Sequence, residues 1–291
     1  METTDLLKKV RKIEIQTRKL SAQVFSGEYH SAFKGRGMAF SEVREYMHGD
    51  DIRSIDWNVT ARFNHPYVKI FEEERELTVM LLVDVSGSGE FGTRKQFKRE
   101  LITELCAVLA FSAIENNDKA GVIFFSDKIE KFIPPKKGKA HILRIIRELI
   151  NFEPASKGTD IGGAIRYFTN MIKKKCIAFL ISDFMGKGYA DALKIASKKH
   201  DLAAIRIYDE REAEMPDIGL VRFTDSETGQ VSVLDTSNIN ARRDYNLWWK
   251  QNDRQITERL NRSGVDFTTL RTDQNYVQSL INLFKKRERR F

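Results

Sequence analysis

Five oxygen-bearing side chains stand at positions where they could hold a metal ion together. Asp84 ends an apolar run, and Ser86 and Ser88 follow it at alternate positions. A later Lys-Gly-Thr-Asp loop carries Thr159, and Asp183 comes directly after a second apolar run. Two carboxylates and three hydroxyls make a hard ligand set that contains only oxygen. Such a set suits Mg²⁺ or Mn²⁺ and suits Zn²⁺ poorly.

The histidines and cysteines do not point to any other metal or to disulfides. The five histidines show no ligand spacing, which argues against zinc. The two cysteines, Cys106 and Cys176, both lie in apolar stretches. We expect them to be reduced core thiols of a cytoplasmic protein rather than a disulfide framework.

Apolar runs of strand length alternate with helical patterns along most of the chain. Strands are predicted at 78–85, 120–126, 128–133, 176–184, 202–209 and 265–272. Helices are predicted at 94–116, 139–151, 158–172, 189–199, 238–262 and 273–288. This alternation predicts an α/β fold with a doubly wound, mostly parallel sheet, covered by helices on both faces. Ligands bind such sheets at the carboxyl ends of the strands, so the five side chains are expected to converge there.

The chain divides into two regions of different sequence pattern. Residues 1–76 are predicted to hold an amphipathic helix at 4–24 and then an irregular polar-aromatic segment. Residues 77–291 form the predicted α/β domain. Within it, residues 219–235 have the pattern of a hairpin with its turn at 226–229.

The spacing of the five polar residues resembles the metal-ion-dependent adhesion site of von Willebrand factor A domains. In that family an Asp-x-Ser-x-Ser motif is followed by a loop threonine and a strand-end aspartate, and all five positions match here. The resemblance implies that the hydroxyls of Ser86, Ser88 and Thr159 touch the metal, while Asp84 and Asp183 act largely through bound waters. The metal then keeps an open position for a partner's Asp or Glu, so the site is expected to bind and not to catalyse.

A wider part of the chain, about residues 27–225, is similar to the bacterial domain-of-unknown-function 58 family. The most specific element is the Gly-Asp-Asp-x-Arg-x-Ile-Asp-Trp string at 49–57, and the segments around 158–165 and 179–184 also match. The resemblance implies a von Willebrand A-like domain and a metal-dependent, chaperone-like system. Members are often encoded beside MoxR-type AAA+ ATPases, so such an ATPase or its client is the expected partner. Many relatives carry N-terminal membrane helices, a property that is not transferred to this chain.

Two enzymatic interpretations, and a purely structural subunit with an empty site, stay open beside the binding module. Gly87, Gly89 and Gly92 form a G-x-G-x-x-G string after a strand, as in dinucleotide-binding proteins. The negative charge of Asp84 would repel a pyrophosphate bound at that position. The acidic residue that should follow the glycines at the end of the next strand also comes too late, at Asp127. The other reading is a metal-dependent phosphoryl hydrolase using Asp84 and Asp183. It lacks a second Asp two residues after Asp84, where an acid/base is wanted.

The net charge of +8 does not by itself define a partner. The whole basic excess lies between residues 77 and 200, in predicted helix ends and loops without interleaved aromatic residues. We interpret it as a solvated face, and we expect no nucleic-acid binding.

The apolar run from Leu105 to Ile114 is too short to span a bilayer, and the charged N-terminus has no signal-peptide pattern.

Overall fold

The computed structural model describes residues 38–73, 77–90, 97–225 and 229–288. The predicted helix at 4–24, the beginning of the helix expected from residue 94 and most of the turn at 226–229 lie outside these residues. The described residues up to Leu77 form one compact unit, and those from Thr78 onward form a second.

The second unit is built on a six-stranded sheet with the order β10-β7-β6-β3-β4-β5. Its strands are β3 (Thr78–Asp84), β4 (Lys119–Phe125), β5 (Ile129–Lys136), β6 (Ile177–Ser182), β7 (Asp201–Tyr208) and β10 (Asp266–Arg271). All neighbouring strands are parallel except β4 and β5, which are antiparallel. The expected doubly wound, mostly parallel sheet is confirmed. Counted from the β5 edge, the strands follow the 3-2-1-4-5-6 order typical of such folds.

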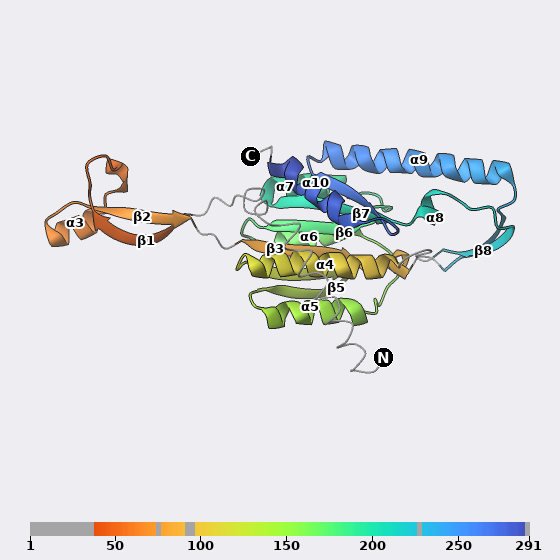
Figure 1. The fold of residues 1–291 in the computed structure, drawn as a ribbon, viewed down its shortest axis with the longest axis horizontal. Helices are drawn as coiled ribbons and strands as arrows, with labels where there is room; N and C mark the ends of the chain where they lie inside the picture. The colour runs from red at the N-terminus through yellow and green to blue at the C-terminus, as the bar shows by residue number, and fades with distance from the viewer. Residues whose placement is uncertain (1–37, 74–76, 91–96, 226–228, 289–291) are drawn as a thin grey trace. The chain divides into compact units, whose positions relative to one another are not determined.

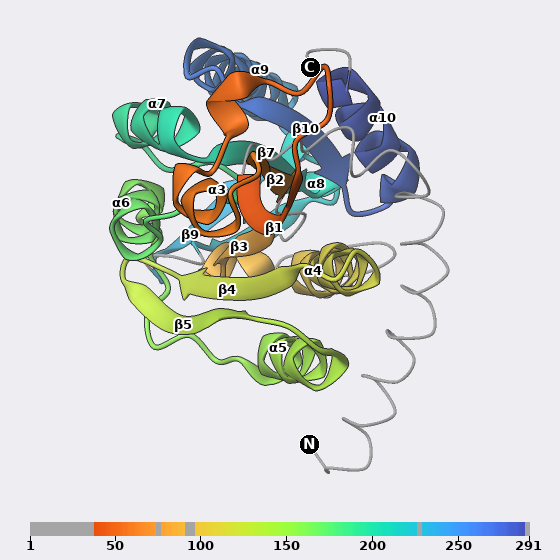
Figure 2. The ribbon, with the colours of Figure 1, turned by 90° about the vertical axis from the view of Figure 1, so that its left-hand side faces the viewer.

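Helices cover both faces of this sheet (Figure 1). They are α4 (Lys98–Glu115), α5 (Lys139–Asn151), α6 (Ile161–Met171), α7 (Ala190–Lys199), α9 (Ile239–Arg262) and α10 (Tyr276–Glu288). Figure 2 shows α6, α7 and α9 on one face and α4 and α10 on the other. A short helix, α8 (Glu210–Ala213), follows β7 and was not expected from the sequence.

Strands β3 and β6 lie side by side at the centre of the sheet and define its switch point. Their chains leave toward opposite faces, β3 through α4 and β6 through α7 (Figure 2). Strand β3 ends at Asp84 and β6 ends at Ser182. This is the place where doubly wound sheets bind their ligands, because the diverging loops leave a crevice there.

The core of the unit explains why the strands read as continuous apolar runs. Every residue of β6 is buried, and so are the last six residues of β3. Because helices cover both faces, side chains that alternate along a strand are buried on either side.

Cys106 and Cys176 are buried, free thiols, as expected. Among the described residues, no helix is long and apolar enough to cross a bilayer.

The C-terminal part adds a small hairpin to this core. Strands β8 (Leu220–Thr224) and β9 (Val231–Asp235) pair in antiparallel register, as the sequence predicts. In helix α9, Trp249 is 8% exposed and packs beside Tyr208, whereas Trp248 is 49% exposed. One of these adjacent tryptophans is therefore part of the core, and the other is half exposed.

The first unit corrects the expectation of an irregular segment. Strands β1 (Met38–Glu45) and β2 (Tyr67–Glu73) form an antiparallel ribbon, with η1 (Ile52–Ser54) and α3 (Trp57–Phe63) between them. A two-stranded ribbon has little surface to bury, so charged residues stand along its strands and the usual alternation is weak.

The acidic residues of the 49–57 string act as local structural ties. Asp50 forms a paired salt bridge with Arg44, with a shortest distance of 2.7 Å. Asp56 caps α3 by accepting from two backbone N–H groups in its first turn. The Asp50–Arg44 pair ties this segment to β1. Trp57 itself is 67% exposed.

Candidate metal-binding site

Asp84 stands at the centre of the polar groups that the switch point gathers. Its side chain is only 5% exposed. Oδ1 accepts a hydrogen bond from the Ser86 N–H at 3.0 Å, and Oδ2 accepts one from the Ser182 hydroxyl at 2.6 Å. The first bond shapes the turn after β3, and the second joins the ends of β3 and β6. The carboxylate is therefore fixed in orientation by both of its neighbours.

Ser86 and Ser88 present their hydroxyls together, as the alternate spacing predicts. The two Oγ atoms lie 3.2 Å apart, within hydrogen-bond distance. The backbone between them enters a short 3₁₀ helix, η2 (Gly87–Glu90). The third glycine of the dinucleotide fingerprint, Gly92, lies outside the described residues, so that reading stays a prediction.

Asp183 reaches the same place from the neighbouring strand. It lines a small cavity of about 10 Å³ together with Asp84 and Ser88. Its Oδ1 accepts from the Met185 N–H at 3.1 Å, and its carbonyl oxygen accepts from Nε of the buried Arg206 at 3.3 Å. These bonds hold the loop after β6 in a defined position. Four of the five predicted residues are thus linked through direct contacts or a shared cavity.

Thr159 lies on a loop that is tied to this centre through its backbone. The Gly87 N–H donates to the carbonyl of Lys157 at 3.0 Å, and the Asp160 N–H donates to the Ser126 carbonyl at 2.8 Å. Thr159, between these two anchors, is half-buried. Asp160 caps α6 by accepting from the Gly163 N–H at 2.8 Å. The structure brings the threonine loop beside the serine loop, and direct ligation by Thr159 stays a prediction.

The burial of Asp84 changes its acidity. Its pKa is raised to about 6, chiefly because burial removes water from the carboxylate and also because the charge of Asp183 lies nearby. The hydrogen bonds from Ser182 and Ser86 oppose this rise because they favour the ionised form. A divalent cation at this point would favour the carboxylate in the same way, since it supplies the opposite charge.

Lys98 and Glu212 belong to the site but were missed in the sequence. The Lys98 ammonium, 2% exposed, donates to Asp183 Oδ2 at 3.3 Å and to Glu212 Oε1 at 2.6 Å. Burial lowers the pKa of Lys98, but the two carboxylates outweigh it, so the pKa stays above its ordinary value. The sequence did hold a signal that Lys98 is buried, because its spacing from Leu101 and Leu105 places it on the apolar face of the predicted helix.

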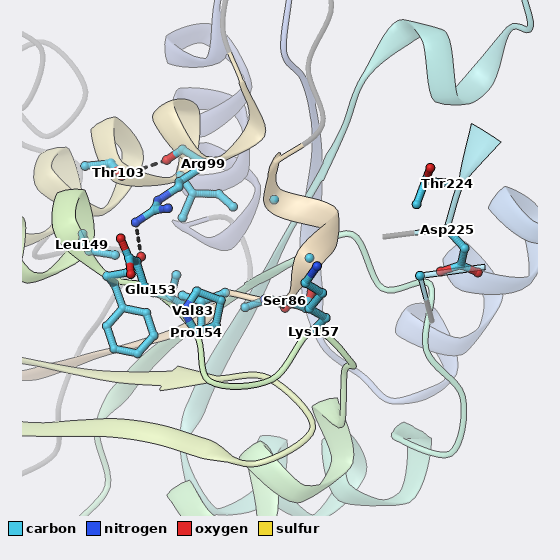
Figure 3. A pocket seen from close by; sticks show the side chains of 17 residues that line it. Val83, Ser86, Arg99, Thr103, Leu149, Glu153, Pro154, Lys157, Thr224 and Asp225 are labelled. Atoms are coloured by element: carbon cyan, nitrogen blue, oxygen red, sulfur yellow. Dashed lines mark hydrogen bonds between the residues drawn. The ribbon is translucent and has the colours of Figure 1, made fainter. Parts of the chain in front are cut away.

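A larger cavity of about 620 Å³ opens from the same residues (Figure 3). Its lining begins at Asp84 and Ser86 and continues to the start of α4, to the loop after α5 and to the β8–β9 hairpin. Figure 3 shows Lys157 near Ser86, between Arg99 on one side and Asp225 on the other. Arg99 donates to the carbonyls of residues 150 and 152 and thereby shapes the wall formed by that loop.

The donor set fits a hard cation held through few direct carboxylate contacts. Within the described residues, no group of three or more His, Cys, Asp or Glu side chains is arranged to hold a metal. The predicted site contains only two such residues and otherwise hydroxyls. Both oxygens of Asp84 already accept hydrogen bonds, whereas the hydroxyls of Ser86 and Ser88 stand side by side. This pattern suits Mg²⁺, which usually keeps several of its waters.

Fold and site together define a doubly wound α/β protein with an oxygen-rich centre at its switch point. The chain belongs to the family of proteins of unknown function DUF58, whose model matches residues 42–255. The uncharacterized protein Rv1480 of Mycobacterium tuberculosis is 28% identical over 283 residues, which are 96% of this chain and 89% of that protein.

Solved structures match this chain at low sequence identity. The conserved hypothetical protein BatB from Bacteroides thetaiotaomicron has a TM-score of 0.50 at 18% identity and covers 73% of this chain and 99% of its own. The VWA domain of SpRpn10 has a TM-score of 0.37 at 11% identity, over 71% of this chain and 94% of its own.

Proposed function

We propose that this chain is a divalent-cation-dependent protein-binding module. Mg²⁺, or Mn²⁺ in its place, is held by Asp84, Ser86, Ser88, Thr159 and Asp183, and an acidic side chain of a partner completes its coordination. The observation that carries the proposal is the meeting of Asp84, the paired serine hydroxyls and Asp183 at the switch point between β3 and β6.

The hydrogen bonds around Asp84 support a binding role. Ser182 and the Ser86 backbone engage both carboxylate oxygens, so the serine hydroxyls are the better placed direct ligands. A metal with few anionic ligands remains a strong Lewis acid and attracts a further carboxylate. The protein's own residues orient the site and leave it open to a partner's carboxylate, and the cation would attract that carboxylate.

The larger cavity provides room for the partner next to the site. It shares Asp84 and Ser86 with the polar centre, and its apolar wall includes Ile102 and Leu149. The exposed Lys157 stands near Ser86 and adds a positive charge beside the approach (Figure 3). An acidic side chain flanked by apolar residues is the partner chemistry that this surface fits.

The family resemblance makes a MoxR-type AAA+ ATPase, or a client of one, the partner in this proposal. A cytoplasmic location, expected from the two buried free thiols, is part of the same proposal. The test is binding of the full chain to the purified MoxR-type ATPase of the same organism, with Mg²⁺ or with a chelator. We expect binding only with Mg²⁺, and its loss in Asp84→Ala.

The two parts of the proposal fail separately in this experiment. Binding that survives both the chelator and Asp84→Ala rejects cation dependence and leaves the partner. Binding in no condition, by a chain that takes up Mg²⁺ in a separate titration, rejects the ATPase and leaves the metal site.

A further inference from the structure

A buried ammonium stands beside the proposed metal site. Lys98 is the first residue of α4, and its side chain is 2% exposed. Burying a cation is costly unless carboxylates compensate it, and a helix N-terminus disfavours a positive charge. Lys98 is compensated from two different parts of the chain, by Asp183 in the loop after β6 and by Glu212 in helix α8.

The ammonium is shared unequally between its two partners. Its distance to Glu212 Oε1 is 2.6 Å, against 3.3 Å to Asp183 Oδ2. Glu212 is itself held firmly, because its Oε2 accepts from the Asp209 N–H at 2.8 Å and its carbonyl accepts from the Tyr245 hydroxyl at 2.8 Å. A fixed Glu212 therefore draws the charge of Lys98 partly away from Asp183.

We propose that Lys98 is an affinity-determining residue of the metal site, which weakens cation binding through its charge, and that Glu212 limits this effect by holding the ammonium. This inference rests on the proposed function. The physical cause is direct: Lys98 and a metal ion compete for the negative charge of Asp183, and like charges at short range repel. Low affinity of this kind makes the site depend on a partner's carboxylate for full occupancy.

The charge balance also explains why an acidic partner is accepted. Asp84, Asp183 and Glu212 each carry one negative charge when ionised, and Lys98 carries one positive charge. A divalent ion brings this group to neutrality, so an approaching carboxylate is not repelled. Without Lys98 the loaded site would retain a negative charge and oppose the partner.

Calorimetric titration of the full chain with Mn²⁺ alone tests the inference. We expect Lys98→Met to bind Mn²⁺ roughly tenfold more tightly, since a nearby positive charge is removed. We expect Glu212→Gln to bind it several-fold more weakly, since Lys98 then turns to Asp183. Lys131→Met removes the same charge from a half-exposed pair with Glu148 and should leave the affinity unchanged.

The two opposite shifts make the result decisive. Equal or weaker binding by a cooperatively folded Lys98→Met overturns the inference. If Lys98→Met does not fold, Glu212→Gln decides, and unchanged or tighter binding by it overturns the inference. Binding by Lys98→Met when the wild type binds none supports it. No binding by the wild type or any variant overturns the proposed function as well, whereas a wild type that binds and unaffected variants overturn only the role of Lys98.

Discussion

The hydroxyl of Ser182 donates a hydrogen bond to Oδ2 of Asp84 at 2.6 Å, joining the last residues of two adjacent strands. Ser182 Oγ also accepts from the N–H of Phe184, at 3.1 Å. This one hydroxyl therefore connects the end of β3 to the loop that carries Asp183. It keeps the two carboxylates of the proposed site in a fixed relation.

Ser182→Ala should weaken the site and the fold together. The substitution removes the hydrogen bond that favours ionised Asp84, so the pKa of Asp84 should rise further above its ordinary value. An unpaired buried carboxylate oxygen should lower the free energy of unfolding by about 1–3 kcal/mol. Urea unfolding measures this loss, and Ser197→Ala, on the half-buried face of α7, is the control. A loss equal to that of the control would contradict the structural role of Ser182.

His200 should make stability depend on pH. It is 1% exposed, and burial together with the charge of Lys199 lowers its pKa to about 4. The ordinary pKa of histidine is about 6.5, so between these values the unfolded chain binds a proton that the folded chain does not. Stability is therefore fully present above about pH 6.5 and falls as the pH drops toward 4, by up to about 3 kcal/mol.

Thermal unfolding of His200→Phe checks this expectation. Phenylalanine can keep the ring contact with Phe168 and cannot take up a proton. The fall in Tm between pH 6.5 and 4.5 should become smaller in this variant. The exposed His48, replaced by Gln, should leave the fall as it is in the wild type. Parallel curves for wild type and His200→Phe would show that another group is responsible.

Gly121→Ala should destabilise the sheet where β4 pairs with the edge strand β5. A Cβ at this position would lie 2.8 Å from the nitrogen of Pro135 and 2.9 Å from the carbonyl oxygen of Ile133, both backbone atoms of β5. Those atoms cannot yield without moving the strand, so we expect a loss of about 2–4 kcal/mol. Gly186→Ala is the matched control, because its nearest atom would be 3.7 Å away. Equal losses in the free energy of unfolding for the two variants, measured in urea, would contradict the close approach of the β5 backbone to Gly121.

The fold was largely predictable from the sequence because each element of the second unit carries its own local signal. The apolar runs of β3 and β6 reflect burial on both faces, and the helix at 139–151 repeats its apolar residues with the helical period. The ends of elements were less predictable. Helix α6 begins at Ile161 rather than near residue 158, because the Asp160 carboxylate caps it there.

For the candidate site, the sequence predicted only those residues that belong to a short motif or follow the end of a strand. Asp84, Ser86 and Ser88 are close in sequence, and strand ends place Asp183. The bonds from Ser182 to Asp84 and from Lys98 to Asp183 and Glu212 join residues 85 to 114 positions apart. No spacing rule encodes such pairs, because the sheet order and the packing of α4 against it create them.

The most direct test of the account is calorimetric titration of the wild type and Asp84→Asn with Mn²⁺. Burial raises the pKa of Asp84, so its ionised form opposes folding as the pH rises through about 6. At pH 7.5 the neutral amide removes this cost, which offsets the loss of one of the two hydrogen-bond acceptors. We predict one Mn²⁺ site per wild-type chain and none in the folded Asp84→Asn variant. Equal binding by both proteins, or no binding by either the wild type or Lys98→Met, would contradict the metal site.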